Sequence, residues 1–378
     1  MKIGFLAYAY VILGRYWHKL NDHADCWWGV PERRLYNLLM EQDVVNVVHH
    51  HEEHVIDHTV KSSNKYVSLD PAGTLGKIAE EISPDIWIAD TANNLNYVTK
   101  KAYWVQTFHA LPIKKHIFYE PVLDYDLILL PGEYHKEEFI MRFKLKEDDE
   151  RLKVVGWPRV DDLTNGDHDR ESVMKSIGID PNKKTIMYAP TWGWGFGTDN
   201  FFARWFDHPV EAFERLCKEI ASQNCNFVVR LHHLSLQNNN EVLIEVAKKY
   251  GVLWQATEIS NFQEDPYQFL RVTDVLISDL SGIIAEFMVL DRPVIYIDPD
   301  EKVAPWGDSD MPKHFRAGHV VKTPEELCEA IRDSLLVPER YSKERNELLS
   351  KLYYKLDGNS TDRAVHEILA FAENRGLT

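Results

Sequence analysis

The feature that most constrains the fold of this chain is a repeated alternation of short apolar runs with amphipathic stretches. Asp85–Ala89 and Leu127–Leu130 are continuous apolar runs of strand length, whereas Pro209–Ser222 carries its apolar residues at helical spacing. Continuous runs without polar alternation are typical of parallel strands that are covered on both faces. The alternation therefore predicts an α/β fold built on parallel sheets.

The same pattern places elements along most of the chain. It predicts strands at Lys2–Ala7, Val44–Val48, Asp85–Ala89, Ala102–Thr107, Leu127–Leu130, Lys153–Gly156, Thr185–Tyr188, Asn226–Leu231, Val275–Ser278 and Pro293–Ile297. It predicts helices at Glu32–Glu41, Leu75–Ile82, Pro209–Ser222, Glu241–Tyr250, Ile283–Leu290 and Thr323–Leu336, and a helical tail over residues 340–374. The polar stretch Asp161–Arg170 interrupts the alternation and has the composition of a linker. We therefore expect two domains, residues 1–165 and 166–378.

Composition narrows the function classes. The formal net charge is −16, which argues against a protein that coats nucleic acid, because neutralising phosphates requires a basic face. No run approaches the roughly 20 apolar residues of a membrane span. The four cysteines form no CxxC pair and no regular framework, as expected for a reducing cytoplasm.

A polar turn follows the apolar run Val275–Ser278. Ser278, Asp279, Ser281 and Gly282 lie where a buried strand would lead into a helix. The unpaired N–H groups of a new helix, together with serine hydroxyls, suit a phosphate group. An ordinary helix cap explains the same residues, because Ser and Asp are preferred at that position.

Other strand ends carry polar groups as well. His109 follows a strand and precedes Lys114 and Lys115, which suits a general base near an anion site, although this segment alone favours a histidine that is hydrogen-bonded within a loop. Arg230 and His232 end another strand. The remaining segments are a Gly- and Trp-rich loop beginning at Thr191 and the helix start Asp357–Arg363.

These five segments and a sixth, Gly156–Asp161, taken together and in their order along the chain, resemble the CDP-glycerol glycerophosphotransferase family, whose members build teichoic-acid-like polymers. The family patterns are Q-T-W-H-G-T-P-L-K-K, G-x-P-R-x-D, Y-A-P-T-W-R, R-P-H-P, S/T-D-Y-S-S and D-G-x-A-T-x-R. They correspond to Gln106–Lys115, Gly156–Asp161, Tyr188–Gly193, Arg230–His233, Ser278–Gly282 and Asp357–Arg363. The resemblance extends from about residue 85 to the end of the chain.

The resemblance implies a GT-B-like fold, with two Rossmann-like domains whose parallel sheets face a central cleft, and a helical C-terminal tail. His109 in the first domain would accept the proton of an acceptor hydroxyl, which attacks the distal phosphorus of a CDP donor and expels CMP. His232 would be the second catalytic histidine. The donor phosphates would be held by Arg230, Ser278, Asp279, Ser281, Gly282 and Arg363, and Lys114, Lys115 and Thr191 would orient the acceptor.

The resemblance also implies the partners. The donor would be a CDP-activated alditol, glycerol before ribitol, and the acceptor a lipid-linked molecule, an oligosaccharide or a polyol, in the synthesis of a cell-surface polymer. No cofactor is expected, and no metal is required if histidine and arginine supply the positive field. We expect a cytoplasmic protein, in peripheral contact with the inner face of the membrane if its acceptor is lipid-linked.

Departures from the family patterns leave the donor and acceptor open. Ala110 and Leu111 replace a Gly-Thr pair, Gly193 replaces an arginine, and Leu231 and His233 replace two prolines. A GT-B glycosyltransferase that uses a nucleotide sugar is therefore one alternative, and a scaffold that binds a nucleotide or polymer without turnover is another.

The histidines between residues 49 and 58 offer a separate hypothesis. In a helix, His50, His54 and His58 would share one face and could bind zinc. The segment is not HExxH, because His51 follows His50. A solvated polar segment after the strand Val44–Val48 is the favoured interpretation, so no metal site is predicted.

Overall fold

The computed structural model describes residues 1–6, 16, 19–20, 22–30, 46–51, 54–58, 65–68, 84–90, 102–108, 111, 120–165, 169–190, 208–231, 241–256, 267–279, 281–297 and 317–377. Packing divides the chain into two compact units. Unit 1 comprises Met1–Asp162 and Lys351–Thr378, and unit 2 comprises Leu163–Ser350. The sequence-based division assigned the whole tail to the second domain, whereas the packing groups the last part of the tail with unit 1.

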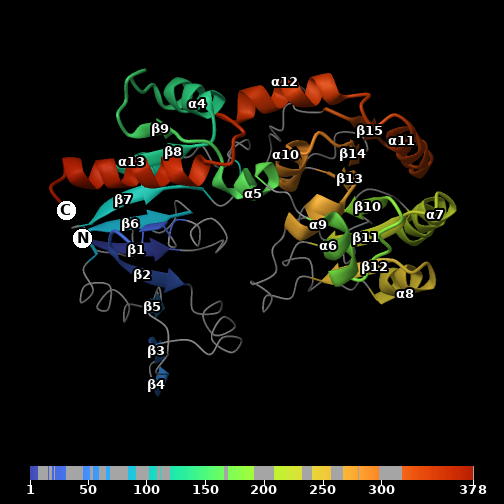
Figure 1. The fold of residues 1–378 in the computed structure, drawn as a ribbon, viewed down its shortest axis with the longest axis horizontal. Helices are drawn as coiled ribbons and strands as arrows, with labels where there is room; N and C mark the ends of the chain where they lie inside the picture. The colour runs from blue at the N-terminus through green and yellow to red at the C-terminus, as the bar shows by residue number, and fades with distance from the viewer. Residues whose placement is uncertain are drawn as a thin grey trace. The chain divides into compact units, whose positions relative to one another are not determined.

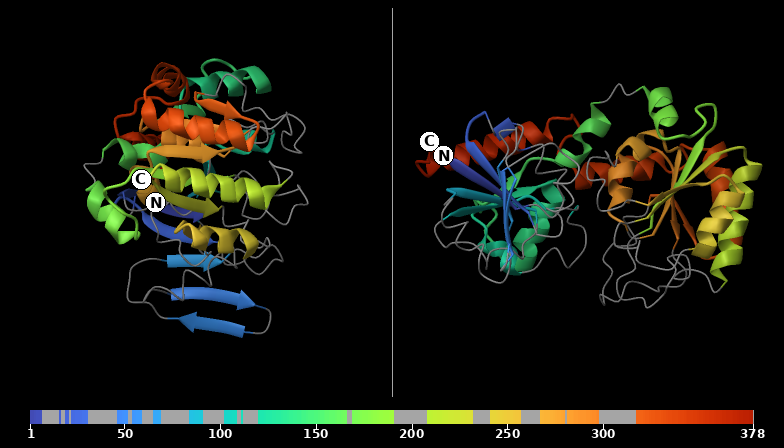
Figure 2. Two further views of the ribbon diagram at one scale, coloured as in Figure 1. Left: turned by 90° about the vertical axis from the view of Figure 1, so that its right-hand side faces the viewer. Right: turned by 90° about the horizontal axis from the view of Figure 1, so that it is seen from below.

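A nine-stranded sheet forms the centre of unit 1, in the order β4-β3-β5-β2-β1-β6-β7-β8-β9. Neighbouring strands are parallel except β3 and β4, an antiparallel pair at one end of the sheet (Figure 2). The strands are β1 (Lys2–Leu6), β2 (Asp25–Val30), β3 (Asn46–His51), β4 (His54–His58), β5 (Lys65–Ser68), β6 (Ile86–Ala89), β7 (Tyr103–Gln106), β8 (Leu127–Leu130) and β9 (Leu152–Val154).

The middle strands of this sheet are buried as their apolar sequences predict. Every residue of β6 and β8 is buried, and so are the last three residues of β7. Helix α4 (Glu133–Phe143) packs against β8 and β9, and α13 (Ser360–Asn374) packs against β8. The short helices η3 (Glu120–Asp124), η4 (Pro158–Val160) and α5 (Asp161–Thr164) complete the described elements of this part of the chain.

Unit 2 contains a six-stranded parallel sheet in the order β12-β11-β10-β13-β14-β15. Its strands are β10 (Thr185–Tyr188), β11 (Asn226–Leu231), β12 (Leu253–Ala256), β13 (Val275–Ser278), β14 (Val294–Ile297) and β15 (His319–Val321). Its helices are α6 (Arg170–Ser176), α7 (Pro209–Ser222), α8 (Glu241–Lys249), α9 (Tyr267–Val272), α10 (Ile283–Met288), α11 (Pro324–Leu336) and α12 (Ser342–Leu352), the last of which continues into unit 1. Figure 1 shows α7 and α8 side by side along β11 and β12.

The helices of unit 2 begin and bury their faces as the sequence predicts. Pro209 stands in the first turn of α7, where its missing N–H is not needed, and the apolar residues of α7 lie in the core. Helix α11 begins after Thr323, whose hydroxyl accepts a hydrogen bond from the backbone N–H of Glu326 at 3.2 Å. Two α/β units with mainly parallel sheets confirm the predicted fold class.

Two motifs that are far apart in the sequence hold the tail in unit 1. The Asp161 carboxylate accepts hydrogen bonds from the backbone N–H groups of Ser360 and Thr361, at 3.0 and 2.7 Å, and from the Thr361 hydroxyl at 2.7 Å. Asp161 thus caps the start of α13 from a position about 200 residues earlier in the chain. The backbone N–H of Tyr354 adds a bond of 2.8 Å to the carbonyl oxygen of Pro131.

The histidine-rich segment forms a hairpin. His51 pairs with His54, and Val47 pairs with His58, across strands β3 and β4. The shared helical face considered for His50, His54 and His58 is therefore wrong, because the segment forms two strands in which His50 pairs with Val55 and not with His54 or His58. The predicted helices Glu32–Glu41 and Leu75–Ile82 lie outside the described residues. In the described part of the chain, no helix combines the length and the apolarity that crossing a bilayer requires.

Candidate functional site

Three neighbouring strands of unit 2 bring polar residues to one edge of the sheet. Strand β10 pairs with β11 on one side and with β13 on the other, all in parallel. The carboxyl ends of parallel strands meet at the same edge, so Arg230 on β11 and Ser278 on β13 flank the end of β10. Ligands of open α/β sheets bind at this edge. Of the expected site residues, the structure thus brings together those on β11 and those around the end of β13.

Arg230 is half-buried, and its guanidinium lies over the ring of Phe269, 4.8 Å from the ring centroid. This cation–π contact holds a planar group with several N–H donors near the end of β11. A guanidinium in such a position can bind two phosphate oxygens at once. His232 directly follows β11 in the sequence and lies outside the described residues.

The polar residues of the turn after β13 differ in their burial and in their hydrogen bonds. Ser278 is fully buried, and its hydroxyl donates a hydrogen bond of 2.6 Å to the carbonyl oxygen of Ala189. That bond joins the ends of β13 and β10, so the proton of this hydroxyl is committed within the sheet. Asp279 is also buried, whereas Ser281 and Gly282 are half-buried.

Gly282 leaves free space beside the turn. A Cβ atom at this position would meet no atom of the described residues within 4 Å. The backbone of Gly282 and the neighbouring Ser281 therefore remain accessible at the start of α10. Of the four residues expected in this turn, these two are the less buried.

A buried carboxylate in α10 escaped the sequence analysis. Glu286 is 5% exposed, and the Tyr267 hydroxyl donates to its Oε2 at 3.3 Å. The available signal was a single glutamate within the otherwise apolar run I-I-A-E-F-M. A buried glutamate of this kind is rare unless it has partners, which makes it notable beside the turn after β13.

Arg363 belongs to unit 1. Its Nε donates to the carbonyl oxygen of Val155 at 2.7 Å, and its Nη1 donates to both carboxylate oxygens of Asp357 at 2.9 Å. Burial alone would raise the pKa of Asp357, but the hydrogen bonds from Arg363 and from the backbone of Asn359 outweigh it and lower that pKa. Through these contacts Arg363 connects the start of α13 with Val155 and Asp357.

Gly156 lies next to these contacts at the start of α13. Its φ of +93° lies in the left-handed region, and a Cβ atom there would come within 2.5 Å of the Ser360 hydroxyl. A glycine at this point thus lets the chain approach α13 closely. The segments Gly156–Asp161 and Asp357–Arg363, both singled out in the sequence, join each other within unit 1.

Five of the expected site residues lie outside the described residues. They are His109, Lys114, Lys115, Thr191 and His232. The described chain does reach Phe108 at the end of β7, one residue before His109. In the described part of the chain, no group of three or more His, Cys, Asp or Glu side chains is arranged to hold a metal ion.

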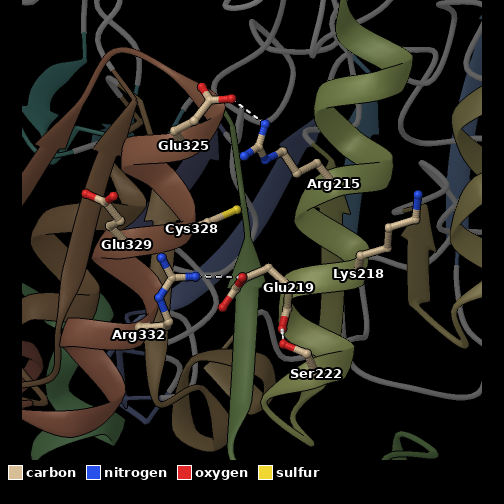
Figure 3. Close-up of a pocket in the computed structure, with 8 residues that line it drawn as sticks. All are labelled: Arg215, Lys218, Glu219, Ser222, Glu325, Cys328, Glu329 and Arg332. Atoms are coloured by element: carbon tan, nitrogen blue, oxygen red, sulfur yellow. Dashed lines mark hydrogen bonds and ion pairs between the residues drawn. The ribbon is translucent and has the colours of Figure 1, made fainter.

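A hollow of about 390 Å³ lies between α7 and α11, and Figure 3 shows the side chains that line it. Charged side chains line it, and they pair with one another: Arg215 with Glu325, and Arg332 with Glu219 at 2.8 Å. Burial and the charge of Glu219 raise the pKa of the Cys328 thiol, which disfavours the reactive thiolate. This hollow is an ion-paired seam between two helices.

The fold and the strand-edge site define a GT-B-like class of protein. The structure of the wall teichoic acid polymerase TagF superposes on 99% of this chain and 89% of that chain, with a TM-score of 0.67 at 17% identity. A variant of TagF was solved after a soak with CDPG and matches with a TM-score of 0.69. At this identity the likeness concerns the fold.

Sequence comparison gives the family. The model of the CDP-Glycerol:Poly(glycerophosphate) glycerophosphotransferase family matches residues 32–370, and the chain belongs to that family. It is 25% identical over 307 residues to a teichoic acid poly(glycerol phosphate) polymerase of Bacillus spizizenii, covering 70% of this chain and 69% of that protein. The polymerase of the same name from Bacillus subtilis is also 25% identical, over 315 residues, but the match spans only 39% of its length and 75% of this chain. The predicted resemblance is confirmed.

Proposed function

We propose that this chain transfers an alditol phosphate, glycerol phosphate in the first instance, from a CDP-linked donor to a hydroxyl group of an acceptor. Family membership supports the class of reaction. The observation that carries the donor site is the strand order β11-β10-β13, which sets Arg230 and the turn at Ser281 and Gly282 on the two sides of the end of β10. A nucleoside diphosphate needs such convergent donors at the carboxyl edge of a parallel sheet.

The reaction breaks one bond and forms another at phosphorus. The acceptor oxygen attacks the phosphorus that carries the alditol, and the bond from that phosphorus to the bridging oxygen breaks, so that CMP leaves with the electron pair. His109 accepts the proton of the acceptor hydroxyl. Arg230 and His232 balance the charge that grows on the leaving phosphate, because phosphoryl transfer depends mainly on positioning and charge stabilisation.

The acceptor is the less constrained half of the proposal. Lys114, Lys115 and Thr191 orient the acceptor, which is a polyol phosphate chain or a lipid-linked oligosaccharide. A lipid-linked acceptor requires that the protein act at the inner face of the membrane. Comparing a soluble oligo(glycerol phosphate) with a lipid-linked acceptor in vesicles separates these two sources.

Nucleotide release tests the donor. The purified protein is incubated with CDP-glycerol, CDP-ribitol and a set of UDP- and GDP-sugars, each with an oligo(glycerol phosphate) acceptor, and the released nucleotide is measured. CMP release from a CDP-alditol supports the proposal. UDP or GDP release from a sugar donor would instead identify a glycosyltransferase, and binding without any release would identify a scaffold.

Variants test the residue roles. Ser281→Ala should raise the KM for the donor by about tenfold, because it removes a hydrogen bond to a charged phosphate. His232→Ala should also weaken donor binding. The matched control is Ser222→Ala, an exposed serine at the end of α7. His109→Ala should lower kcat by about a hundredfold or more, as expected for loss of a general base. Unchanged turnover in that variant would eliminate His109 as the base.

A further inference from the structure

At the end of β7 in unit 1, the side chain of Gln106 forms a bracket of two hydrogen bonds to the backbone that follows it. The Gln106 side chain is fully buried, and its Oε1 accepts hydrogen bonds from the backbone N–H groups of Thr107 and Phe108, both at 2.9 Å. The N–H of Thr107 also continues the ladder to the carbonyl oxygen of Ala89 at 2.9 Å. The N–H of Phe108 leaves the sheet, so Gln106 supplies the acceptor that a buried N–H group requires.

Phe108 sits in a strained backbone conformation. Its φ is +61°, in the left-handed region that bulky residues rarely adopt. Its ring is buried and packs against Phe139 of α4, with 6.1 Å between the ring centroids. Leu111, three residues further on, is buried as well. His109 and Ala110 lie between these two buried residues in the sequence.

A large residue keeps such a left-handed conformation only where surrounding contacts stabilise it. At Phe108 these contacts are the hydrogen bond to the Gln106 oxygen and the packing of the Phe108 ring against Phe139. The Gln106 Nε2 has no hydrogen-bond partner among the described residues, so the fold uses only the oxygen of this amide. The bracket thus sets the direction in which the chain leaves the sheet, one residue before His109.

We propose that Gln106 is a positioning residue for His109. By accepting the two N–H groups, Gln106 maintains the left-handed turn at Phe108 that directs the chain into His109. This inference rests on the proposed role of His109 as the general base. A base must lie within hydrogen-bond reach of the proton it accepts, so a relaxed turn should reduce turnover more than donor binding.

Kinetics with CDP-glycerol and an oligo(glycerol phosphate) acceptor test this role. Gln106→Met removes the acceptor oxygen at similar size and should lower kcat by about tenfold or more, with the KM for CDP-glycerol changed by no more than about twofold. The matched control is Gln223→Met, the same substitution at an exposed residue after α7, which should change neither constant. Gln106→Glu keeps an oxygen at the Oε1 position and should therefore retain most of the wild-type kcat that Gln106→Met loses. Its added carboxylate should move the acidic limb of the pH profile to higher pH.

A second measurement does not depend on turnover. In protein with ¹³C-labelled histidine, the imidazole signal missing from His109→Ala identifies His109, and its pH titration is compared in wild type, Gln106→Met and Gln223→Met. A shifted titration or chemical shift in Gln106→Met alone supports positioning. If His109→Ala stays active, the base role fails, and this comparison still decides whether Gln106 sets the environment of His109.

The proposal is overturned if Gln106→Met leaves both kcat and the His109 signal unchanged. It is also overturned if the variant changes the KM for CDP-glycerol as strongly as kcat, because that pattern indicates a general loss of structure. If Gln106→Met does not fold, Gln106→Glu carries the test. A kcat as low in Gln106→Glu as in His109→Ala, at every pH, then contradicts the proposal.

Discussion

His135 should make the stability of unit 1 depend on pH. The side chain lies in the first turn of α4 and is fully buried, and neither ring nitrogen has a hydrogen-bond partner among the described residues. Burial lowers the pKa of His135 to about 3, and the nearby backbone of Gly132 opposes this effect only in part. A neutral ring fits this site, and a protonated ring does not.

The direction of the effect follows from proton binding. In the unfolded chain the histidine pKa is about 6.5, so below that pH the unfolded state holds a proton that the folded state lacks. The free energy of unfolding is therefore unaffected by this group above about pH 6.5 and falls by about 1.4 kcal/mol per pH unit between about pH 6.5 and pH 3. Between pH 7.5 and pH 5 the loss amounts to about 2 kcal/mol.

Urea denaturation followed by tryptophan fluorescence measures this loss. His135→Leu removes the titrating group, so its free energy of unfolding should fall by about 2 kcal/mol less than that of the wild type between pH 7.5 and pH 5. The control is His366→Leu, an exposed histidine on α13 of the same unit, which should retain the wild-type pH dependence. If wild type and His135→Leu lose equal stability over this range, the buried neutral histidine is refuted.

Three further substitutions test the packing. Asp161→Ala should destabilise unit 1 by about 2 to 4 kcal/mol, measured by urea denaturation, because three buried hydrogen bonds to the start of α13 are lost. A loss of about 0.5 kcal/mol or less would contradict the capping role. Gly156→Ala should cost more than Gly178→Ala in thermal denaturation, because both glycines have positive φ but only the first is crowded; equal costs would show that strain alone matters. Arg345→Met should destabilise unit 2 by about 2 kcal/mol or more, because the buried guanidinium donates a hydrogen bond of 2.7 Å to Asp291. Lys343→Met, at an exposed residue of the same helix, should be nearly neutral. Similar effects of the two substitutions would exclude the bond to Asp291 as a source of stability.

Local patterns were sufficient for much of unit 2. The predicted bounds of α7, β11 and β13 agree with the structure residue for residue, because each combines a clear apolar pattern with a defined start. The strands β2, β4, β5, β12 and β15 were missed, and β2 and β15 show why. The first contains two tryptophans and a glycine, and the second is only three residues long, so neither shows a recognisable period.

The candidate site could be predicted only as a set of residue types. The sequence placed Ser278 and Arg363 among the groups that hold the donor phosphates, because serine and arginine suit phosphate. The structure shows the Ser278 hydroxyl bonded to Ala189 and the Arg363 guanidinium bonded to Asp357 and Val155. Conversely, the sequence showed Gln106 only as the first residue of the pattern Gln106–Lys115, because the role proposed for it depends on a backbone conformation that only the folded chain displays.

The sequence by itself determined the α/β class, the order of most strands and helices, and the family, because apolar periodicity and short motifs are local properties of the chain. Only the tertiary structure decided that the Asp161 carboxylate caps α13, that the His135 ring is buried with no hydrogen-bond partner among the described residues, and that the end of the tail packs with unit 1. Burial and hydrogen-bond partners depend on residues that can lie 200 positions apart or more. The choice among such partners follows from how the sheets and helices pack, which no short segment of the sequence specifies.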